Sequence, residues 1–196
     1  MIKTRRELQK ALAECQKAYD VAGGFSFKEW LYDLLFPNYY YHFMRNLCHL
    51  EYCQNQGGGA VLLKLWYRWR CWRLRFKTGI ELSPNCAGIG LHISHGKCVI
   101  SASARLGHHC KILSDVTIGG QGRYDVVGAP VIGNRVFISS GAKIIGPIRI
   151  ADDVVIGANA VVIKDILESG TTWAGVPARK ISDEGSRHYL RACFTD

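Results

Sequence analysis

The chain has 196 residues, a formal net charge of +9 and a pI near 9.2. This length suits one domain with an appendage, and the positive charge suits an anionic ligand or an anionic surface. No uncharged apolar run of about 18 residues occurs, so no transmembrane helix is expected. Nucleic acid ranks last among partners, because the sequence has no helix-turn-helix, zinc-finger or RNA-binding signature.

Residues 1–79 have helical patterns. Three predicted helices come first: 4–20, 26–35 and about 38–54. The first starts with a capping box of Thr4 and Glu7 and stops at Gly23-Gly24. Its apolar face consists of Leu8, Leu12, Cys15 and Tyr19. The N-terminus therefore leads into a charged helix rather than an apolar signal core.

The segment 61–77 combines aromatic and basic side chains. On a helical wheel its large apolar side chains form one stripe: Leu62, Leu65, Trp66, Trp69, Trp72 and Phe76. One interpretation is an interfacial helix that makes peripheral contact with anionic lipid headgroups. The other is a helix that packs this stripe on the first β-coil and leaves its basic face in water. We favour the second, because it is the more common arrangement.

From Ile100 to Ile166 the sequence has a six-residue period. Branched aliphatic residues occupy every first position of the repeat: Ile100, Leu106, Ile112, Ile118, Ile132, Ile138, Ile144, Ile150, Ile156 and Val162. Four residues after each comes a small or apolar second position, from Ala104 to Ile166, with Cys110 and Gly122 among them. This period fits neither a helix nor a series of hairpins, and it predicts a parallel β-helix.

Two irregularities interrupt the period. Gly88 and Ser94 keep the spacing of six but suit an interior poorly, so either the coil is distorted or a deletion and an insertion compensate. Fourteen residues separate Ile118 from Ile132, where twelve would keep phase, and this predicts a loop around 120–130. Distorted repeats and loops are where chemistry concentrates.

The eight cysteines have no CxxC or metal-ligand spacing. Cys86, Cys98 and Cys110 recur at intervals of twelve, as small apolar residues do at repeated interior positions. We therefore expect reduced, buried thiols in a cytoplasmic protein, and no metal site.

Three motifs together resemble the hexapeptide-repeat acyltransferases, and within them the serine acetyltransferase branch. They are Ile-Ser-His at 93–95, Val-Thr-Ile-Gly-Gly at 116–120 and Trp-Ala-Gly-Val-Pro-Ala-Arg at 173–179. The resemblance implies a mainly β fold, with a left-handed parallel β-helix over 80–181 and a C-terminal tail over 182–196. It also implies acetyl-CoA as acetyl donor and a homotrimer with active sites between neighbouring subunits.

The resemblance makes His95 the general base. A neutral imidazole can take the proton of a hydroxyl as its oxygen attacks a thioester carbonyl. His92 is the rival base, and His108 and His109 are expected on the surface.

Three positions depart from the serine acetyltransferase pattern. Ser94 stands where those enzymes have an Asp before the catalytic His, Glu81 where they have an upstream Asp, and Ala129 where they have a second His. These departures favour a sugar or polysaccharide hydroxyl as acceptor over L-serine, with a non-catalytic scaffold as a third alternative. Asp125 and Glu81 are the expected catalytic partners of His95.

The resemblance also implies six residues that bind acetyl-CoA: Gly119, Gly120, Ser140, Ala158, Lys164 and Arg179. The glycines allow close approach of the thioester end, and Ser140 and Ala158 lie where pantetheine makes contacts. Lys164 and Arg179 lie where cations meet the nucleotide phosphates. The alternative for Lys164 is a plain surface lysine at the end of a strand, and we favour the cofactor contact.

Overall fold

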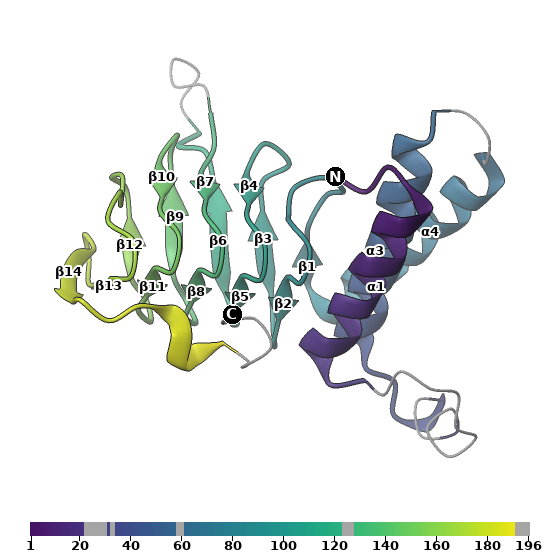
Figure 1. Cartoon of the computed structure of the whole chain (residues 1–196), viewed down its shortest axis with the longest axis horizontal. Helices are drawn as coiled ribbons and strands as arrows, with labels where there is room; N and C mark the ends of the chain where they lie inside the picture. Colours follow the sequence, from purple (N-terminus) through teal and green to yellow (C-terminus); the bar gives the residue numbers. More distant parts are fainter. Residues whose placement is uncertain (22–30, 32–33, 58–60, 123–127, 191–196) are drawn as a thin grey trace.

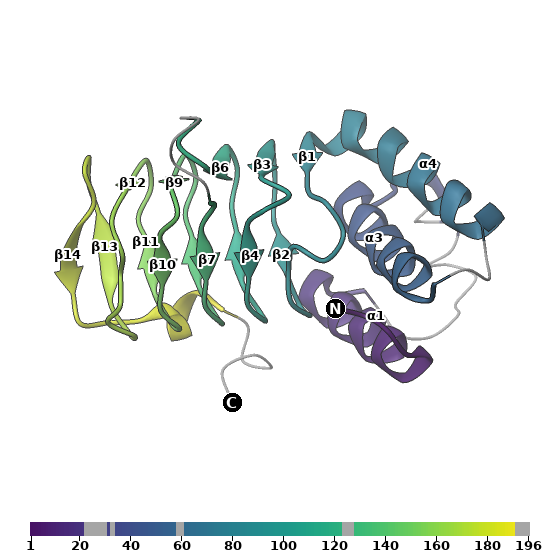
Figure 2. The ribbon, with the colours of Figure 1, turned by 90° about the horizontal axis from the view of Figure 1, so that it is seen from above.

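The computed structural model describes residues 1–21, 31, 34–57, 61–122 and 128–190. Three helices pack together at one end of a stack of β-coils (Figures 1 and 2): α1 (Arg5–Tyr19), α3 (Tyr39–Asn55) and α4 (Val61–Thr78). In Figure 2, α3 lies between α1 and α4, and the β-coils extend away from them on one side. The helical segment therefore covers only the first coil.

Short strands form the coils. They are β1 (Ile80–Glu81), β2 (His92–Ile93), β3 (Cys98–Ile100), β4 (Arg105–Leu106), β5 (Lys111–Ile112), β6 (Val116–Gly119), β7 (Val131–Ile132), β8 (Phe137–Ile138), β9 (Lys143–Ile145), β10 (Arg149–Ile150), β11 (Val155–Ile156), β12 (Val161–Val162), β13 (Thr172–Ala174) and β14 (Arg179–Ser182). Three sheets make the three sides, in the orders β1-β3-β6-β9-β12, β10-β7-β4 and β14-β13-β11-β8-β5-β2. All paired strands are parallel except β13 and β14. The predicted parallel β-helix is confirmed.

The interior follows the six-residue period. All ten first positions are buried, none more than 6% exposed. Nine of the ten second positions are buried too, but Gly122 is exposed in the loop after β6, so its assignment to the interior was wrong. Cys86, Cys98 and Cys110 are buried free thiols, as predicted. Burial raises the pKa of Cys110 to about 12, which keeps this thiol protonated and unreactive.

The first coil contains a deletion and a compensating insertion. The register advances by 18 residues from Glu81 to Val99, by 19 from Ala87 to Leu106 and from Ile93 to Ile112, and by 18 again from Ile100 to Ile118. The first coil is thus one residue short before Ala87 and one residue long between Ile93 and Cys98. The second of the two alternatives for Gly88 and Ser94 is right, and the extra residue falls in the turn that carries His95.

The loop after β6 lies where it was predicted, between Gly119 and Val131, but the insertion into the coil is larger than the spacing suggested. The register from Leu106 to Ile132 and from Ile118 to Ile144 is 26 residues, eight more than a regular coil of 18. The spacing suggested only two extra residues, because it assumed another repeat where the described residues have no strand between β6 and β7. Asp125, a predicted catalytic residue, lies outside the described residues.

The helical segment matches part of its prediction. Thr4 caps α1 with the expected capping box. The helix ends at Tyr19, before the two glycines, because the C-cap residue Asp20 is left-handed with a φ of 59°. The helix expected over 26–35 falls mostly outside the described residues. The predicted packing of the α4 stripe on the first coil is wrong: all six of its side chains are exposed, by 45 to 84%.

A narrow line of side chains on the opposite side of α4 makes its contacts. Cys71 and Thr78 are buried, and Tyr67 and Leu74 pack partly against the core. These positions are spaced by four, three and four residues, so they form one line along a helix, and this line faces mainly α3. The wheel shows which residues group together, but it does not say which group is buried.

The chain after β14 folds back along the coils. A short 3-10 turn, η1 (Ser186–Tyr189), lies against the six-stranded sheet, where the Ser186 N–H donates to the Asp153 carbonyl at 3.1 Å. The Tyr189 ring stacks on Phe137 with 4.6 Å between centroids. These contacts fix the described part of the tail on the outside of the β-helix.

Candidate active site

His95 lies in the bend between β2 and β3, on the turn that contains the extra residue. Its side chain is exposed, and no residue in the described parts of the chain hydrogen-bonds its imidazole. An imidazole in this position is open to a substrate hydroxyl. Its role as general base stays a prediction.

Two tyrosines from the helical segment fix the backbone around His95. The Tyr19 hydroxyl of α1 donates to the Ile93 carbonyl at 3.2 Å and accepts from the Ile93 N–H at 2.9 Å. The Tyr40 hydroxyl of α3 accepts from the Gly96 N–H at 2.9 Å. Burial raises the pKa of Tyr19, so this phenol stays neutral and able to donate. The helices thus hold the residues on both sides of His95.

The other histidines have different surroundings. His92 is half-buried, and its ring meets the edge of Tyr19 with 4.7 Å between centroids. His108 is exposed as expected, but its Nδ1 accepts from the Ile89 N–H at 3.0 Å. His109 is half-buried rather than on the surface, and desolvation lowers its pKa. His95 and His108 are the exposed ones of the four, and because His108 already accepts a hydrogen bond, His95 is the exposed imidazole without a partner in the described part of the chain.

Of the two predicted acidic partners of His95, only Glu81 is among the described residues, and it is engaged elsewhere. The exposed Glu81 carboxylate forms an ion pair with Arg75 of α4. Ser94 is half-buried, and its N–H donates to the Ile112 carbonyl within the sheet. Within the described residues, therefore, the turn is positioned by phenols and backbone bonds, and a catalytic role for Glu81 stays a prediction.

Ser140 and Ala158 lie on the same edge of the β-helix as His95. Gly96 approaches Ser114 so closely that an added Cβ would lie 2.7 Å from the serine Cβ. The Ser114 hydroxyl donates to the Ser140 hydroxyl at 3.1 Å, and the Asn159 N–H, directly after Ala158, donates to the Ser140 carbonyl at 2.9 Å. Successive turns thus continue from His95 along one edge.

Lys164 and Arg179 meet in a cavity of about 340 Å³ near the far end of the coils. Trp173, Pro177 and Ala178 supply much of its apolar lining. Neither Lys164 nor Arg179 has a carboxylate partner among the described residues. Lys180 in the same cavity, by contrast, is paired with Glu168 and Asp183, which raise its pKa. Two uncompensated cations beside an apolar wall suit a phosphate-bearing ligand.

The two glycines differ in what they permit. An added Cβ at Gly119 would meet only Ser101, at 3.9 Å, so this position leaves room on the outer face. An added Cβ at Gly120 would lie 2.9 Å from the Gly128 carbonyl, so Gly120 lets the two ends of the loop come together. Gly119 ends β6, and Ser140 and Ala158 precede β9 and β12, so the expected cofactor residues border the five-stranded sheet.

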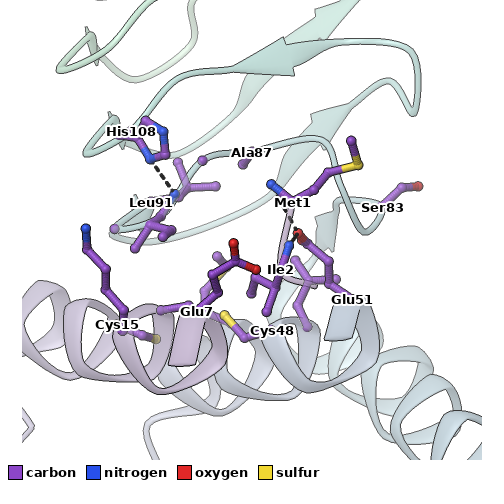
Figure 3. A pocket seen from close by; sticks show the side chains of 17 residues that line it. Met1, Ile2, Glu7, Cys15, Cys48, Glu51, Ser83, Ala87, Leu91 and His108 are labelled. Carbon is purple, nitrogen blue, oxygen red and sulfur yellow. Dashed lines mark hydrogen bonds and ion pairs between the residues drawn. The ribbon is translucent and has the colours of Figure 1, made fainter. Parts of the chain in front are cut away.

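A second cavity, of about 320 Å³, lies between the helical segment and the first coil (Figure 3). Glu51 is buried there and accepts from the N–H groups of Ile2 at 2.8 Å and Asn85 at 3.1 Å. His108 lines the other side. These bonds tie α3 to the first coil, and the cavity is part of that junction.

Comparison with known proteins gives the same fold. Residues 129–164 match the family described as bacterial transferase hexapeptide (six repeats). Serine acetyltransferase from Helicobacter pylori strain J99 is 44% identical over 112 residues, 56% of this chain and 65% of that protein. The Synechococcus elongatus serine acetyltransferase is 39% identical over 115 residues, 58% of this chain and 47% of that protein. The chain thus spans less than two thirds of the length of each of these relatives.

Solved structures match over almost the whole chain. A coenzyme A complex of serine acetyltransferase from Brucella abortus strain S19 has a TM-score of 0.69 at 28% identity, covering 92% of this chain and 70% of that one. A serine complex from Neisseria gonorrhoeae has a TM-score of 0.69 at 26% identity, covering 91% and 70%. The fold is therefore the predicted left-handed parallel β-helix with N-terminal helices. Residues 129–164 thus resemble the bacterial transferase hexapeptide family, and the relatives and solved structures named here are serine acetyltransferases.

Proposed function

We propose that this chain is an acetyl-CoA-dependent O-acetyltransferase in which His95 is the general base. The observation that carries the proposal is the exposed His95, on a turn fixed by Tyr19 and Tyr40, at the start of the edge that continues through Ser140 and Ala158. The similarity to serine acetyltransferases supports it.

The chemistry needs one proton-transfer group and a site for the donor. Acetyl-CoA would supply the acetyl group as an activated thioester, with Lys164 and Arg179 holding its phosphates. His95 would take the acceptor's hydroxyl proton while the new C–O bond forms, and would return that proton to the sulfur as the C–S bond breaks. One ester and one thiol result, so no redox partner or metal is needed.

The proposed acceptor is L-serine. The relatives are named serine acetyltransferases, and one of the solved structures contains serine. These similarities do not support the sugar or polysaccharide acceptor expected from the sequence departures. A sugar hydroxyl stays the second candidate on one observation: Ala129, where the serine enzymes have a second His, is half-buried and packs against the apolar core without a polar side chain.

By the same relationship we propose a homotrimer with active sites between neighbouring subunits. The predicted cytoplasmic location also stays a prediction. No helix among the described residues is long and apolar enough to cross a membrane.

A thiol-release assay tests the proposal with the full chain. We expect His95→Ala to lower the rate of acetyl transfer by roughly 10²–10⁴-fold, the range for a positioned general base, while CoA binding persists. His92→Ala is the control and should retain most of the activity. A large loss in His92→Ala with normal His95→Ala activity would reverse the assignment, and no CoA binding by the wild type would leave the scaffold alternative.

The acceptor is settled by comparing L-serine with a panel of sugars in the same assay. Saturation by serine with kcat/KM of about 10⁴ M⁻¹s⁻¹ or more fits a native substrate. If serine does not saturate the enzyme at millimolar concentration while a sugar does, the second candidate replaces the first.

A further inference from the structure

The outer surface of α4 has an unusual composition for a surface in water. Its exposed stripe contains three tryptophans, two leucines and a phenylalanine: Leu62, Leu65, Trp66, Trp69, Trp72 and Phe76. Leu34, which precedes α3, joins Trp66 and Trp69 in lining a cavity of about 540 Å³. Contiguous exposed apolar surface of this kind marks an interaction site more often than a bare surface.

Cations lie beside this stripe, because Arg70, Arg73 and Lys77 line the same cavity as Trp66 and Trp69. Helix α4 contains six basic residues and no acidic one: Lys64, Arg68, Arg70, Arg73, Arg75 and Lys77. Only Arg75 has a carboxylate partner among the described residues. The Arg70 guanidinium lies 5.7 Å from the Trp66 ring centroid, and that of Arg73 lies 5.0 Å from the Trp69 ring centroid. Cations and indoles are thus presented side by side.

We propose that the outer face of α4 binds the surface of an anionic lipid bilayer. Exposed tryptophans suit the headgroup region, and the adjacent cations suit anionic phosphates there. A helix of 18 residues is about 27 Å long, and its contact line to α3 lies opposite the stripe, so the helix can lie flat on the bilayer. In Figure 2 α4 lies at the outer edge of the helical segment, where the β-coils do not obstruct it.

The positive charge of α4 argues against a second copy of the chain as the partner that covers its outer face. Two α4 faces docked on each other would bring basic residues together, with no acidic residue on either helix to neutralise them. An anionic bilayer supplies the missing negative charge. The proposal is independent of the acetyl-transfer activity.

Vesicle flotation of the full chain tests the proposal. We expect binding to phosphatidylcholine vesicles that contain about 30% phosphatidylglycerol, weak binding to pure phosphatidylcholine, and loss of binding at high salt. Failure of the wild type to bind the anionic vesicles at low salt would overturn the proposal.

Two double variants, each of which removes two positive charges, test whether the bilayer binds at α4. Arg70→Gln with Arg73→Gln should lower the partition coefficient about 30-fold, since each cation near the surface contributes about fivefold. Arg5→Gln with Arg6→Gln removes the same charge from α1, on the other side of α3, and should have little effect. Equal losses in both double variants would show that only net charge matters, and would overturn the assignment to α4.

A second pair of variants tests the apolar stripe. Trp72→Ser with Phe76→Ser should reduce binding to anionic vesicles at least tenfold, whereas Leu167→Ser, an equally exposed apolar residue on the coils, should not. Circular dichroism and thiol release would show that the variants remain folded. If light scattering instead shows self-association of the wild type that the Trp72→Ser/Phe76→Ser variant abolishes, a second copy covers the face and the lipid proposal is wrong.

Discussion

Lys164 and Arg179 belong to different secondary-structure elements, but their side chains line the same cavity. Lys164 follows β12 and Arg179 begins β14, and their two uncompensated charges distinguish them from Lys180. We expect Lys164→Gln or Arg179→Gln to raise the KM for acetyl-CoA roughly fivefold to thirtyfold with little change in kcat, because each loses a charge-assisted bond to phosphate.

The donor itself provides the control for this prediction. With acetyl-pantetheine, which lacks the nucleotide phosphates, the variants and the wild type should have the same kinetics. Lys180→Gln should have a smaller effect on the KM for acetyl-CoA, since Glu168 and Asp183 already neutralise Lys180. An equal rise in KM for both donors would show that these cations do not meet the phosphates.

Asp152 makes the stability of one turn depend on pH. The Asn134 N–H donates to its carboxylate at 2.8 Å and the Asn134 side-chain amide at 3.1 Å, and these bonds lower its pKa. A lowered pKa in the folded state stabilises the fold above the unfolded pKa, near 3.9, and this contribution is lost as pH falls through the folded value.

The expected contribution is about 1 kcal/mol, because the carboxyl is partly exposed. Urea unfolding between pH 6 and pH 2, as chosen test conditions, should show a smaller loss of stability on acidification for Asp152→Asn than for the wild type. If the free energy of unfolding falls by the same amount on acidification in the two proteins, the contact with Asn134 makes no measurable contribution to the pH dependence of stability.

At the scale of elements, β2 occupies a special place. It is the last strand of the six-stranded sheet, paired on one side with β5, and its other edge meets α1. Unpaired strand edges expose backbone groups that need partners. The Tyr19 hydroxyl hydrogen-bonds both backbone groups of Ile93: it accepts from the N–H and donates to the carbonyl. The helical segment therefore replaces a missing coil and at the same time fixes the turn with His95.

Tyr40→Phe separates positioning from folding. The substitution removes the acceptor of the Gly96 N–H and leaves the ring in place. We expect kcat to fall severalfold while the KM for acetyl-CoA and the melting temperature change little, because Gly96 adjoins His95 on an exposed turn. Tyr52→Phe on the same helix is the control. An unchanged kcat would show that the turn keeps its geometry without this bond.

At the scale of the whole molecule, the period of the sequence was enough to predict the β-helix. Ten aliphatic residues at one spacing leave few alternatives, because a single repeat cannot bury its own face. The period could not locate the deletion and the insertion in the first coil, since the two cancel in the count of residues. The spacing likewise underestimated the loop after β6, because a loop of any length can connect two coils.

The surroundings of the candidate site were less predictable than its residues. Tyr19 was placed on the apolar face of the first helix, but nothing local indicates a partner 74 residues later. The α4 stripe was assigned to the interior because amphipathic patterns define a face without saying what covers it. Lys164 and Arg179 were named by resemblance, and only the fold shows that they line one cavity.

The antiparallel direction of β14 affects whether further coils can add to the end of the β-helix. A stack of parallel coils is a template for its own extension, since its last strand offers a row of backbone groups to any chain running the same way. Here β14 returns antiparallel on β13 and presents Arg179 and Lys180 on an exposed strand. At the other end, helices stand where a further coil would add. The β-helix therefore has a fixed length, like a polymer with both ends blocked.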